Sequence, residues 1–348
     1  MRMICFFTVI LTIIPILPVF PDRRPVIYGI TAVEDVPVDE HPTVDRLAAH
    51  FTVICRGGSE GYGWGFCQTV EYLKRQRPPR RMFHRAMRCV VERCEKDWLS
   101  GGASQTETDK YARRIGRALR VLAVCADSKD RRLFRKCYMN PVNLEYLRAS
   151  AFFAHLVSVP DDDIPFVIKT VSNPALFSWE DRAWMYKEIG AAYSFAPPDR
   201  RSLYAAPFRD VAWKESHIYN FIKCDNLMKA FDPEYAKSEE RIRLIDHFRT
   251  SPQQEGVNRE GWLPTLDKAL DECTNQTVKV EAPWFVFLDA YPPFVSYEES
   301  ILGEKPNPYR TAIRIAAGSV CVIGLFAGMW VWMRRKRMGR SDPFPHFE

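Results

Sequence analysis

The strongest catalytic pattern in the sequence is Gly-x-Ser-x-Gly at residues 57–61, which places Ser59 where serine hydrolases carry their nucleophile. Such a serine needs a preceding strand within a parallel sheet, a sharp turn and a following helix, with an acid and a histidine later in the chain. Residues 50–55 read as a β-rich run, but too little chain precedes them to form the other strands. The pattern therefore favours a glycine-rich surface loop between Cys55 and Cys67 over a nucleophile.

No other catalytic or cofactor-binding motif stands out. The sequence lacks His-Glu-x-x-His and a phosphate-binding glycine loop before Lys-Ser or Lys-Thr. A zinc site is not expected, because there is no Cys-x-x-Cys and no histidine pair at ligand spacing. No cofactor is expected. Acidic residues are numerous, so a membrane-anchored lumenal enzyme that uses unidentified acids stays an alternative.

The ten cysteines divide by position. Cys5 and Cys321 lie in apolar segments near the two ends of the chain, and eight cysteines lie between those segments. An even number of cysteines in an exported region indicates disulfides, because that compartment is oxidising. The eight disulfide candidates are Cys55, Cys67, Cys89, Cys94, Cys125, Cys137, Cys224 and Cys273. Pairs 55–67 and 125–137 are near enough in sequence to close local loops, but about a hundred pairings are possible.

The two ends predict how the chain meets a membrane. Residues 1–21 carry an early arginine and an apolar run, typical of a secretory signal peptide, with an uncleaved anchor as the alternative. Residues 315–333 are apolar and uncharged, and at about 1.5 Å per residue they match the ~30 Å hydrocarbon layer. A basic cluster opens the tail, residues 334–348, and favours the cytoplasmic side. We expect a single-pass type I protein of the plasma membrane or secretory pathway, with a stalk at 304–314; a tail-anchored protein is the rival.

Two smaller signals bear on assembly and modification. Ala317, Cys321, Gly324 and Gly328 recur at spacings of four, three and four, so they share one face of the apolar helix. Small residues at such spacing let two helices approach closely, which predicts a homodimer through the span. Asn275 begins the glycosylation sequon Asn-Gln-Thr, which predicts a glycan on the lumenal side.

The charge distribution bears on the class of partner. The formal net charge is +6, but seven of the cations lie at the two chain ends, so the region between them is almost neutral. Nucleic acid is therefore not an expected partner. Residues 71–148 hold 20 Lys or Arg and nine Asp or Glu. This excess predicts either solvated arginine faces, some paired with acids of the later half, or a surface for an anionic glycan or acidic protein.

Helical periodicity dominates the region between the apolar ends. In residues 106–125 the apolar residues recur at spacings of four, four, three and three, which predicts an amphipathic helix. Its arginines lie on the other faces, and Thr106 or Thr108 is the expected N-cap. Further helices are predicted at 81–98, 141–157, 178–193, 210–231, 234–249 and 260–272. Residues 278–297 predict a short strand or two, and 194–208 a loop. The expected fold class is mainly α with minor β.

A break at residues 158–166 divides the expected ectodomain. Before it lies a cysteine-rich basic part, residues 22–159, and after it an aromatic-rich part, residues 160–303. The three acids of the break predict a helix N-cap followed by Pro165 in the first turn, rather than a calcium cluster. We expect a disulfide-stabilised helical ectodomain that forms either one domain or two subdomains.

The sequence does not identify a biochemical activity. We expect a type I membrane protein whose disulfide-bonded helical ectodomain binds a protein or glycan partner. A lumenal enzyme and a structural or adhesive surface protein are the alternatives. In the glycine-rich loop, Tyr62, Trp64 and Phe66 are either contact residues or members of the core.

Overall fold

The computed structural model describes five ranges of the chain: 39–57, 64–100, 105–250, 259–275 and 293–303. Within these ranges the regular structure is helical and no strand occurs, which confirms the mainly α fold class. All of the described helices belong to one compact unit, which ends at Leu302.

The helices are short to medium in length. The α-helices are α2 (Val44–Gly57), α3 (Trp64–Gln76), α4 (Arg80–Ser100), α5 (Gln105–Ala123), α6 (Ser128–Met139), α7 (Glu145–Leu156), α8 (Ile164–Thr170), α9 (Trp179–Phe195), α10 (Ser202–Trp213), α11 (Ile218–Phe231), α12 (Glu239–Thr250), α13 (Arg259–Thr274) and α14 (Tyr297–Ser300). Short 3-10 helices are η2 (Asp161–Asp163), η3 (Pro198–Arg200) and η4 (Pro233–Lys237).

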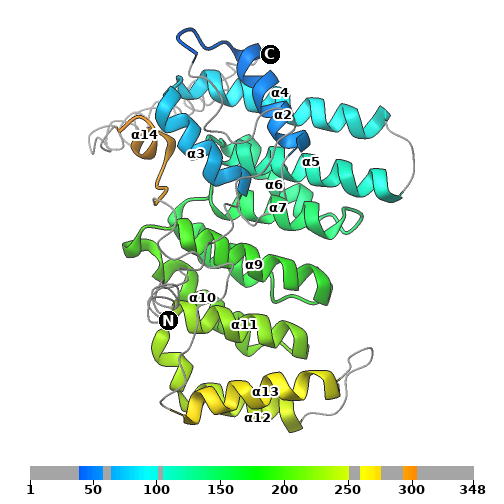
Figure 1. Cartoon of the computed structure of the whole chain (residues 1–348), viewed down its shortest axis with the longest axis vertical. Helices are drawn as coiled ribbons and strands as arrows, with labels where there is room; N and C mark the ends of the chain where they lie inside the picture. Colours follow the sequence, from blue (N-terminus) through cyan, green and yellow to red (C-terminus); the bar gives the residue numbers. More distant parts are fainter. Residues whose placement is uncertain (1–38, 58–63, 101–104, 251–258, 276–292, 304–348) are drawn as a thin grey trace, which may run out of the picture. The chain divides into compact units, whose positions relative to one another are not determined.

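The longer helices pack on one another in a regular order (Figure 1). α2 packs on α4, α4 on α5, α5 on α7, α7 on α9, α9 on α11, and α11 on α13. The other helices pack against members of this stack: α3 on α5, α6 on α7, α10 on α8 and α11, and α12 on α13. Each layer buries its apolar face mainly against its neighbours, as in helical repeat proteins, although the sequence shows no internal repeat.

One hydrophobic core runs through the stack. It includes Phe153 of α7, Ile189 of α9 and Phe248 of α12, all of which are buried. Leu156 and Ile164 both belong to it, so the core continues across the predicted boundary between residues 159 and 160. The helices on either side of that boundary therefore share buried surface.

Phe66 is fully buried in this core. Its ring meets those of Phe153, Phe195 and Phe294 edge to face, with centroid separations of 5.5, 5.1 and 5.0 Å. Such aromatic pairs are worth about 0.5–1.5 kcal/mol beyond the area that they bury. Of the two alternatives for Phe66, the structure therefore supports a core residue.

Buried arginines form ion pairs with acids of other helices and, in one case, of the loop between α10 and α11. The ion pairs are Arg120–Glu188, Arg148–Asp181, Arg182–Glu215 and Arg241–Asp225. None of these side chains is more than 8 % exposed. Removing one partner of a buried pair leaves an uncompensated charge, at a cost of about 3–5 kcal/mol, so the pairs oppose slippage of one helix on another. Arg117 and Arg120 of α5 are buried, which corrects the expectation that the arginines of this helix are solvated.

The local start signals were predicted with mixed success. Ser178 and Asp181 form a capping box at the start of α9, where the predicted helix at 178–193 begins. Asp163 occupies the N-cap position of α8 and Pro165 lies in the first turn, as expected, but the Asp163 side chain makes no capping hydrogen bond.

Two local expectations near the beginning of the described chain were wrong. Residues 50–55 are part of α2 and not a β-rich run, because the apolar side chains of Phe51, Ile54 and Cys55 recur at helical spacing and face the core. α5 begins at Gln105, so Thr106 and Thr108 lie inside the helix and neither is its cap.

Two expectations around α10 were also wrong. The predicted loop at 194–208 is largely helical, because α9 continues to Phe195 and α10 begins at Ser202. The predicted helix at 210–231 is two helices, α10 and α11. Between them Glu215 accepts hydrogen bonds from the backbone N–H groups of the next two residues, each at 2.9 Å, which competes with helical hydrogen bonding.

Several predicted features lie outside the described residues. They are the signal peptide at 1–21, the stalk at 304–314, the apolar span at 315–333 with Ala317, Cys321, Gly324 and Gly328, the tail at 334–348, Ser59, Tyr62, the side chain of Trp64, and most of the β segment at 278–297. Among the helices that are described, none is both long enough and apolar enough to cross a membrane.

The described cysteines are free thiols in the structure. They are Cys55, Cys89, Cys94, Cys125, Cys137, Cys224 and Cys273, whereas the side chain of Cys67 lies outside the described part. Cys89 and Cys94 point in different directions along α4, as expected: Cys94 is buried and Cys89 is half-buried. Disulfide stabilisation stays a prediction.

Candidate functional site

A groove of about 810 Å³ opens between α5, α7 and α9 and the loops that precede α7 and α9. It is lined by Asp109, Ala112, Arg113, Pro141, Val142, Asn143, Leu144, Glu145, Tyr146, Arg148, Pro174, Ala175, Leu176, Phe177, Ser178, Asp181 and Trp184. Volumes of about 300–1,000 Å³ are typical of ligand-binding clefts. The groove is therefore the candidate binding site in the part of the chain that the structure describes.

Local hydrogen bonds shape the loop before α7. The side-chain amide of Asn143 donates to the carbonyl oxygen of Cys137 at 2.8 Å, which ties the loop to the end of α6. The backbone N–H of Val142 donates to Asn140 Oδ1 at 3.1 Å. These bonds hold the Val142 side chain outward, where it is 86 % exposed.

The floor of the groove is a buried ion pair. Arg148 pairs with Asp181 and also donates to the carbonyl oxygens of Tyr138 and Leu176, each at 3.0 Å. Its guanidinium lies 5.2 Å from the centre of the Phe177 ring. Arg148 is thus committed to partners within the protein.

The two carboxylate oxygens of Asp181 differ in their contacts. Its Oδ2 accepts from Arg148 and from the backbone N–H of Ser178, the latter at 3.0 Å. Its Oδ1 is buried and has no hydrogen-bond partner among the described residues. This atom has almost no solvent-accessible surface, so a ligand in the groove does not reach it in this conformation.

The walls combine aromatic and apolar side chains. The rings of Tyr146 and Trp184 meet edge to face at 6.3 Å. Arg113 lies 5.5 Å from the Tyr146 ring centre, and Lys187 lies 4.5 Å from that of Trp184, so both rings already accept cations. Leu176 and three further small apolar residues form an exposed rim, namely Pro141, Pro174 and Ala175.

Acidic side chains set the electrostatics of one end. Burial raises the pKa of Glu145, and the carboxylates of Asp181, Glu180 and Asp109 raise it further, against the opposing effect of Arg148. Burial is the first cause of this shift, and the neighbouring carboxylates add to it because like charges disfavour ionisation.

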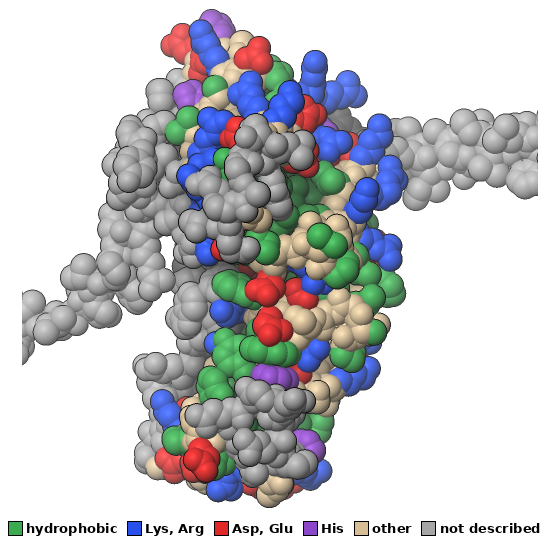
Figure 2. All heavy atoms as spheres, turned by 90° about the vertical axis from the view of Figure 1, so that its right-hand side faces the viewer, with side chains coloured by type: hydrophobic (Ala, Val, Ile, Leu, Met, Phe, Trp, Pro, Cys, Tyr) green, Lys and Arg blue, Asp and Glu red, His purple; other side chains and the backbone are tan. Residues whose placement is uncertain are grey.

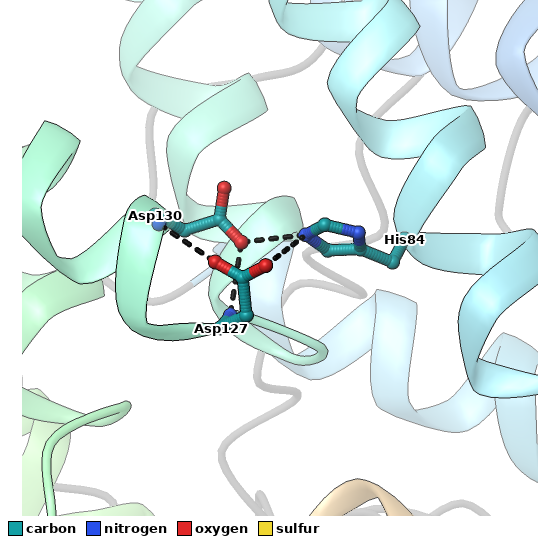
Figure 3. Close-up of side chains that lie close together, drawn as sticks. All are labelled: His84, Asp127 and Asp130. Carbon is teal, nitrogen blue, oxygen red and sulfur yellow. Dashed lines mark hydrogen bonds and ion pairs between the residues drawn. The ribbon is translucent and has the colours of Figure 1, made fainter.

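A second cluster of titratable side chains joins α4 to the start of α6 (Figure 3). His84 Nε2 lies 2.6 Å from Asp130 Oδ2 and 3.9 Å from Asp127 Oδ2. Both carboxylates form the capping box of α6, and Arg88 approaches Asp130 Oδ1 at 3.3 Å. Burial acts to raise the pKa of Asp127, but the backbone N–H groups of Asp130 and Lys129 outweigh it and hold that pKa below its usual value. These contacts describe a helix cap fastened to α4.

The positive charge predicted for residues 71–148 is only partly at the surface. Figure 2 shows Lys and Arg side chains gathered toward the upper end of one face, with acidic and hydrophobic side chains nearer its middle. Arg117 and Arg120 are buried, whereas Arg132 and Arg135 of α6 are exposed. The binding of an anionic partner stays a prediction.

The residues singled out in the sequence do not line the groove. All seven described cysteines lie elsewhere, and Asn275 is exposed just beyond the end of α13. Cys55 and Cys94 come together where α2 packs on α4. Burial raises the pKa of the Cys55 thiol, and the Cys94 thiol adds to this effect.

Sequence reasoning missed the groove as a site. A signal for one of its residues existed, because Ser178-x-x-Asp181 is a capping-box pattern. The partner of Asp181, however, is Arg148, which lies 33 residues earlier. No spacing rule for a single helix or strand links two such residues, so their meeting requires the three-dimensional packing of α7 on α9.

Comparisons with known proteins give no relative. No protein-family model matches the chain, and neither the curated proteins nor the solved structures contain a significant match.

Proposed function

We propose that the helical unit is a binding module, and that the groove between α5, α7 and α9 holds a segment of a partner protein. The observation that carries the proposal is a groove of about 810 Å³ with an exposed apolar rim that includes Val142 and Leu176. Apolar contact supplies affinity in such sites, and a few placed polar groups supply orientation. Stacked helices often present an extended binding surface of this kind.

Val142 is the most useful probe of this proposal. Its side chain is 86 % exposed on the rim, so a substitution there does not disturb the core. We would select binders from a phage-displayed library of random 12-residue peptides on the full-length chain, purified in mild detergent. We expect Val142→Arg to weaken the selected peptides about tenfold or more, because a bulky, solvated cation replaces the apolar contact.

A matched control distinguishes the groove from the rest of the surface. Val53 of α2 is 40 % exposed and does not line the groove. Val53→Arg should bind the selected peptides like the unmodified chain. Equal affinity of the Val142→Arg variant for every selected peptide would exclude the groove as the binding site.

We further propose that this unit lies on the extracellular or lumenal side of a type I membrane protein. The apolar ends of the sequence, the basic cluster after the second apolar segment and the sequon at Asn275 support this orientation. Asn275 is exposed, so it is accessible to a glycosyltransferase. When the full chain is expressed in animal cells, we expect a glycosidase-sensitive mobility shift that Asn275→Gln abolishes. An unglycosylated chain whose body is digested by protease from the cytosolic side would contradict this orientation.

A further inference from the structure

We infer that the outer faces of α4 and α6 form a docking surface for a sulfated glycan chain. This basic patch consists of six side chains, namely Arg81, Arg85 and Arg88 of α4 and Lys129, Arg132 and Lys136 of α6. None of them lines the groove. A glycan chain meets the patch only on the extracellular or lumenal side, so the inference rests on the proposed orientation of the chain.

The first argument is the one-sided charge of α4. Residues 72–91 contain seven Lys or Arg and no acid. Arg81, Arg85 and Arg88 follow one another at spacings of four and three, so they share one face of the helix. Phe83 and Met87 are fully buried on the opposite side. The exposed face of this half of α4 is therefore basic.

The second argument is that α6 continues the basic face. Lys129, Arg132 and Lys136 are exposed and recur at spacings of three and four. Asp130 is the only acid of this helix, and its side chain is fully buried. Asp130 lies 2.6 Å from His84 and 3.3 Å from Arg88, so it joins the two helices (Figure 3) and does not offset the charge at the surface.

The third argument is that most of these cations have no acidic partner. Other cations nearby are used within the fold: Arg80 pairs with Glu298, and Arg131 donates to the carbonyl oxygen of Ser158. Five cations of the patch form no ion pair within the described part of the chain, namely Arg81, Arg85, Lys129, Arg132 and Lys136. Their charges sum to a positive potential that attracts a polyanion.

The chemistry of the patch favours a glycan over a protein partner. None of the large, exposed hydrophobic side chains of the described residues lies on α4 or α6. Protein interfaces usually have an apolar or aromatic centre, which this surface lacks. Anionic lipids are concentrated in the cytoplasmic leaflet, away from the proposed location of the patch. A sulfated glycan is bound largely through charge, and clusters of Lys and Arg are typical of heparin-binding surfaces.

The test measures the binding of a fluorescent, size-defined heparin oligosaccharide to the full-length chain in mild detergent. The tail is also basic at residues 334–337, so all comparisons use a background in which these four residues are replaced by Gln. Arg81→Gln combined with Arg85→Gln should weaken binding about tenfold, measured by fluorescence anisotropy. The dependence of affinity on salt should also become shallower, because fewer counterions are released on binding.

A matched pair of substitutions separates the patch from the net charge. Arg243 of α12 and Lys268 of α13 are exposed and lie outside the patch. Arg243→Gln combined with Lys268→Gln removes the same number of cations and should leave the heparin affinity unchanged. Desulfated heparin should bind the background chain at least about tenfold more weakly than heparin, because the charges that the patch contacts are missing.

Three outcomes would contradict the inference. Equal losses for the two double variants would show that only the net charge matters. Poly-glutamate that binds as tightly as heparin would identify the patch as a surface for an acidic protein. Patch-dependent heparin binding by a chain that receives no glycan at Asn275 and is digested from the cytosolic side would overturn the orientation, and with it a glycan as the partner. Heparin binding that ignores the patch in a glycosylated chain would overturn this inference alone.

Discussion

At the scale of single residues, Arg241 shows how a buried cation in the described part of the chain is held by several acceptors at once. Its side chain is fully buried on α12, where it makes two hydrogen bonds with Asp225, at 2.8 and 2.9 Å, and one each with Glu272 and the carbonyl oxygen of Ala236. Arg241→Met would leave two carboxylates in the interior without this partner. We expect the free energy of unfolding to fall by about 3–5 kcal/mol, measured by urea denaturation followed by circular dichroism.

The same helix supplies the matched control. Arg243 pairs with Glu239 across one helical turn, but its side chain is 75 % exposed. Exposed pairs of this kind contribute about 0.3–0.5 kcal/mol, so Arg243→Met should change the unfolding midpoint very little. Equal losses for the two variants would contradict the assignment of Arg241 as the charge that holds α11, α12 and α13 together.

His155 makes stability depend on pH. Burial lowers its pKa from 6.5 to about 4, and the charges of Arg135 and Arg131 lower it further. The unfolded chain therefore binds a proton at a higher pH than the folded chain does. The contribution of His155 is complete above pH 6.5 and is lost as the pH falls toward 4, by up to about 3 kcal/mol.

Urea unfolding at pH 7, 5.5 and 4 measures this effect. Many groups titrate in that range, so the comparison with His155→Gln isolates the contribution of one side chain. The variant should lose less stability than the unmodified chain between pH 7 and 4. His41→Gln, at an exposed position, should lose as much as the unmodified chain. If the His155→Gln variant lost as much stability between pH 7 and 4 as the unmodified chain, His155 would not be the source of the pH dependence.

The limits of sequence reasoning at this scale follow from how charges are paired. The arginines of α5 read as a solvated face because Arg is seldom buried. Arg120 is nevertheless only 2 % exposed, since Glu188, 68 residues later, is brought against it by the packing of α9. The expectation that some of these arginines pair with acids of the later half is confirmed by this contact. The local sequence pattern did not predict which arginine of α5 pairs with an acid of the later half.

At the scale of helices, Gly116 sets how closely α5 approaches α7. A Cβ at this position would lie 2.8 Å from Ser150 Oγ and 3.0 Å from both Ser150 Cβ and Tyr146 Cε1. Ser150 is not free to move away, because its hydroxyl accepts a hydrogen bond from Arg120 at 3.2 Å. Gly116→Ala gains about 1 kcal/mol of helix propensity, but overpacking costs about 1–3 kcal/mol, so we expect a net loss of stability.

A double-mutant cycle tests the cause. If the clash with Ser150 is responsible, Gly116→Ala should destabilise the Ser150→Gly background less than the unmodified chain, as measured by thermal unfolding. Strictly additive effects of the two substitutions would show that the loss arises elsewhere. A Gly116→Ala variant more stable than the unmodified chain would show that α5 and α7 separate without cost.

The helices themselves were largely predictable. The periodic run at 106–125 and the predicted segment at 81–98 correspond to α5 and α4. The start of α9 was predicted correctly although most of its residues are buried, so that it has no clear polar face. α2 was misread because Phe51, Val53 and Ile54 have strand propensity, and propensity gives way to tertiary packing.

At the scale of the whole molecule, the order in which the helices stack was beyond the sequence. The contacts between α5 and α7, α7 and α9, and α9 and α11 join helices that are not consecutive in the chain. No internal repeat signals this arrangement, and no comparison with known proteins supplies it. The groove depends on that order, because its lining comes from α5, α7 and α9 together.

The proposed orientation across the membrane makes a specific prediction about covalent structure. Cys55 and Cys94 are both buried where α2 packs on α4, and Arg56 and Asp97, close by in sequence, are joined by hydrogen bonds of 2.8 to 3.0 Å. In an oxidising compartment we expect these two thiols to form one disulfide. The two electrons and two protons pass to an oxidised dithiol–disulfide exchange partner, whose own disulfide is reduced.

Mass spectrometry of the chain isolated from a secretory compartment, after alkylation without reduction, should recover Cys55 and Cys94 in one cross-linked peptide pair. The link closes a loop of 38 residues, so in the chain-entropy account Cys55→Ser should lower the unfolding free energy by about 3–4 kcal/mol in oxidised protein. The same substitution should cost much less in chain made in a reducing cytosol, where no link forms. Full alkylation of both thiols in native, secretory-pathway protein would contradict the pairing, and free thiols at every central cysteine would contradict the orientation as well.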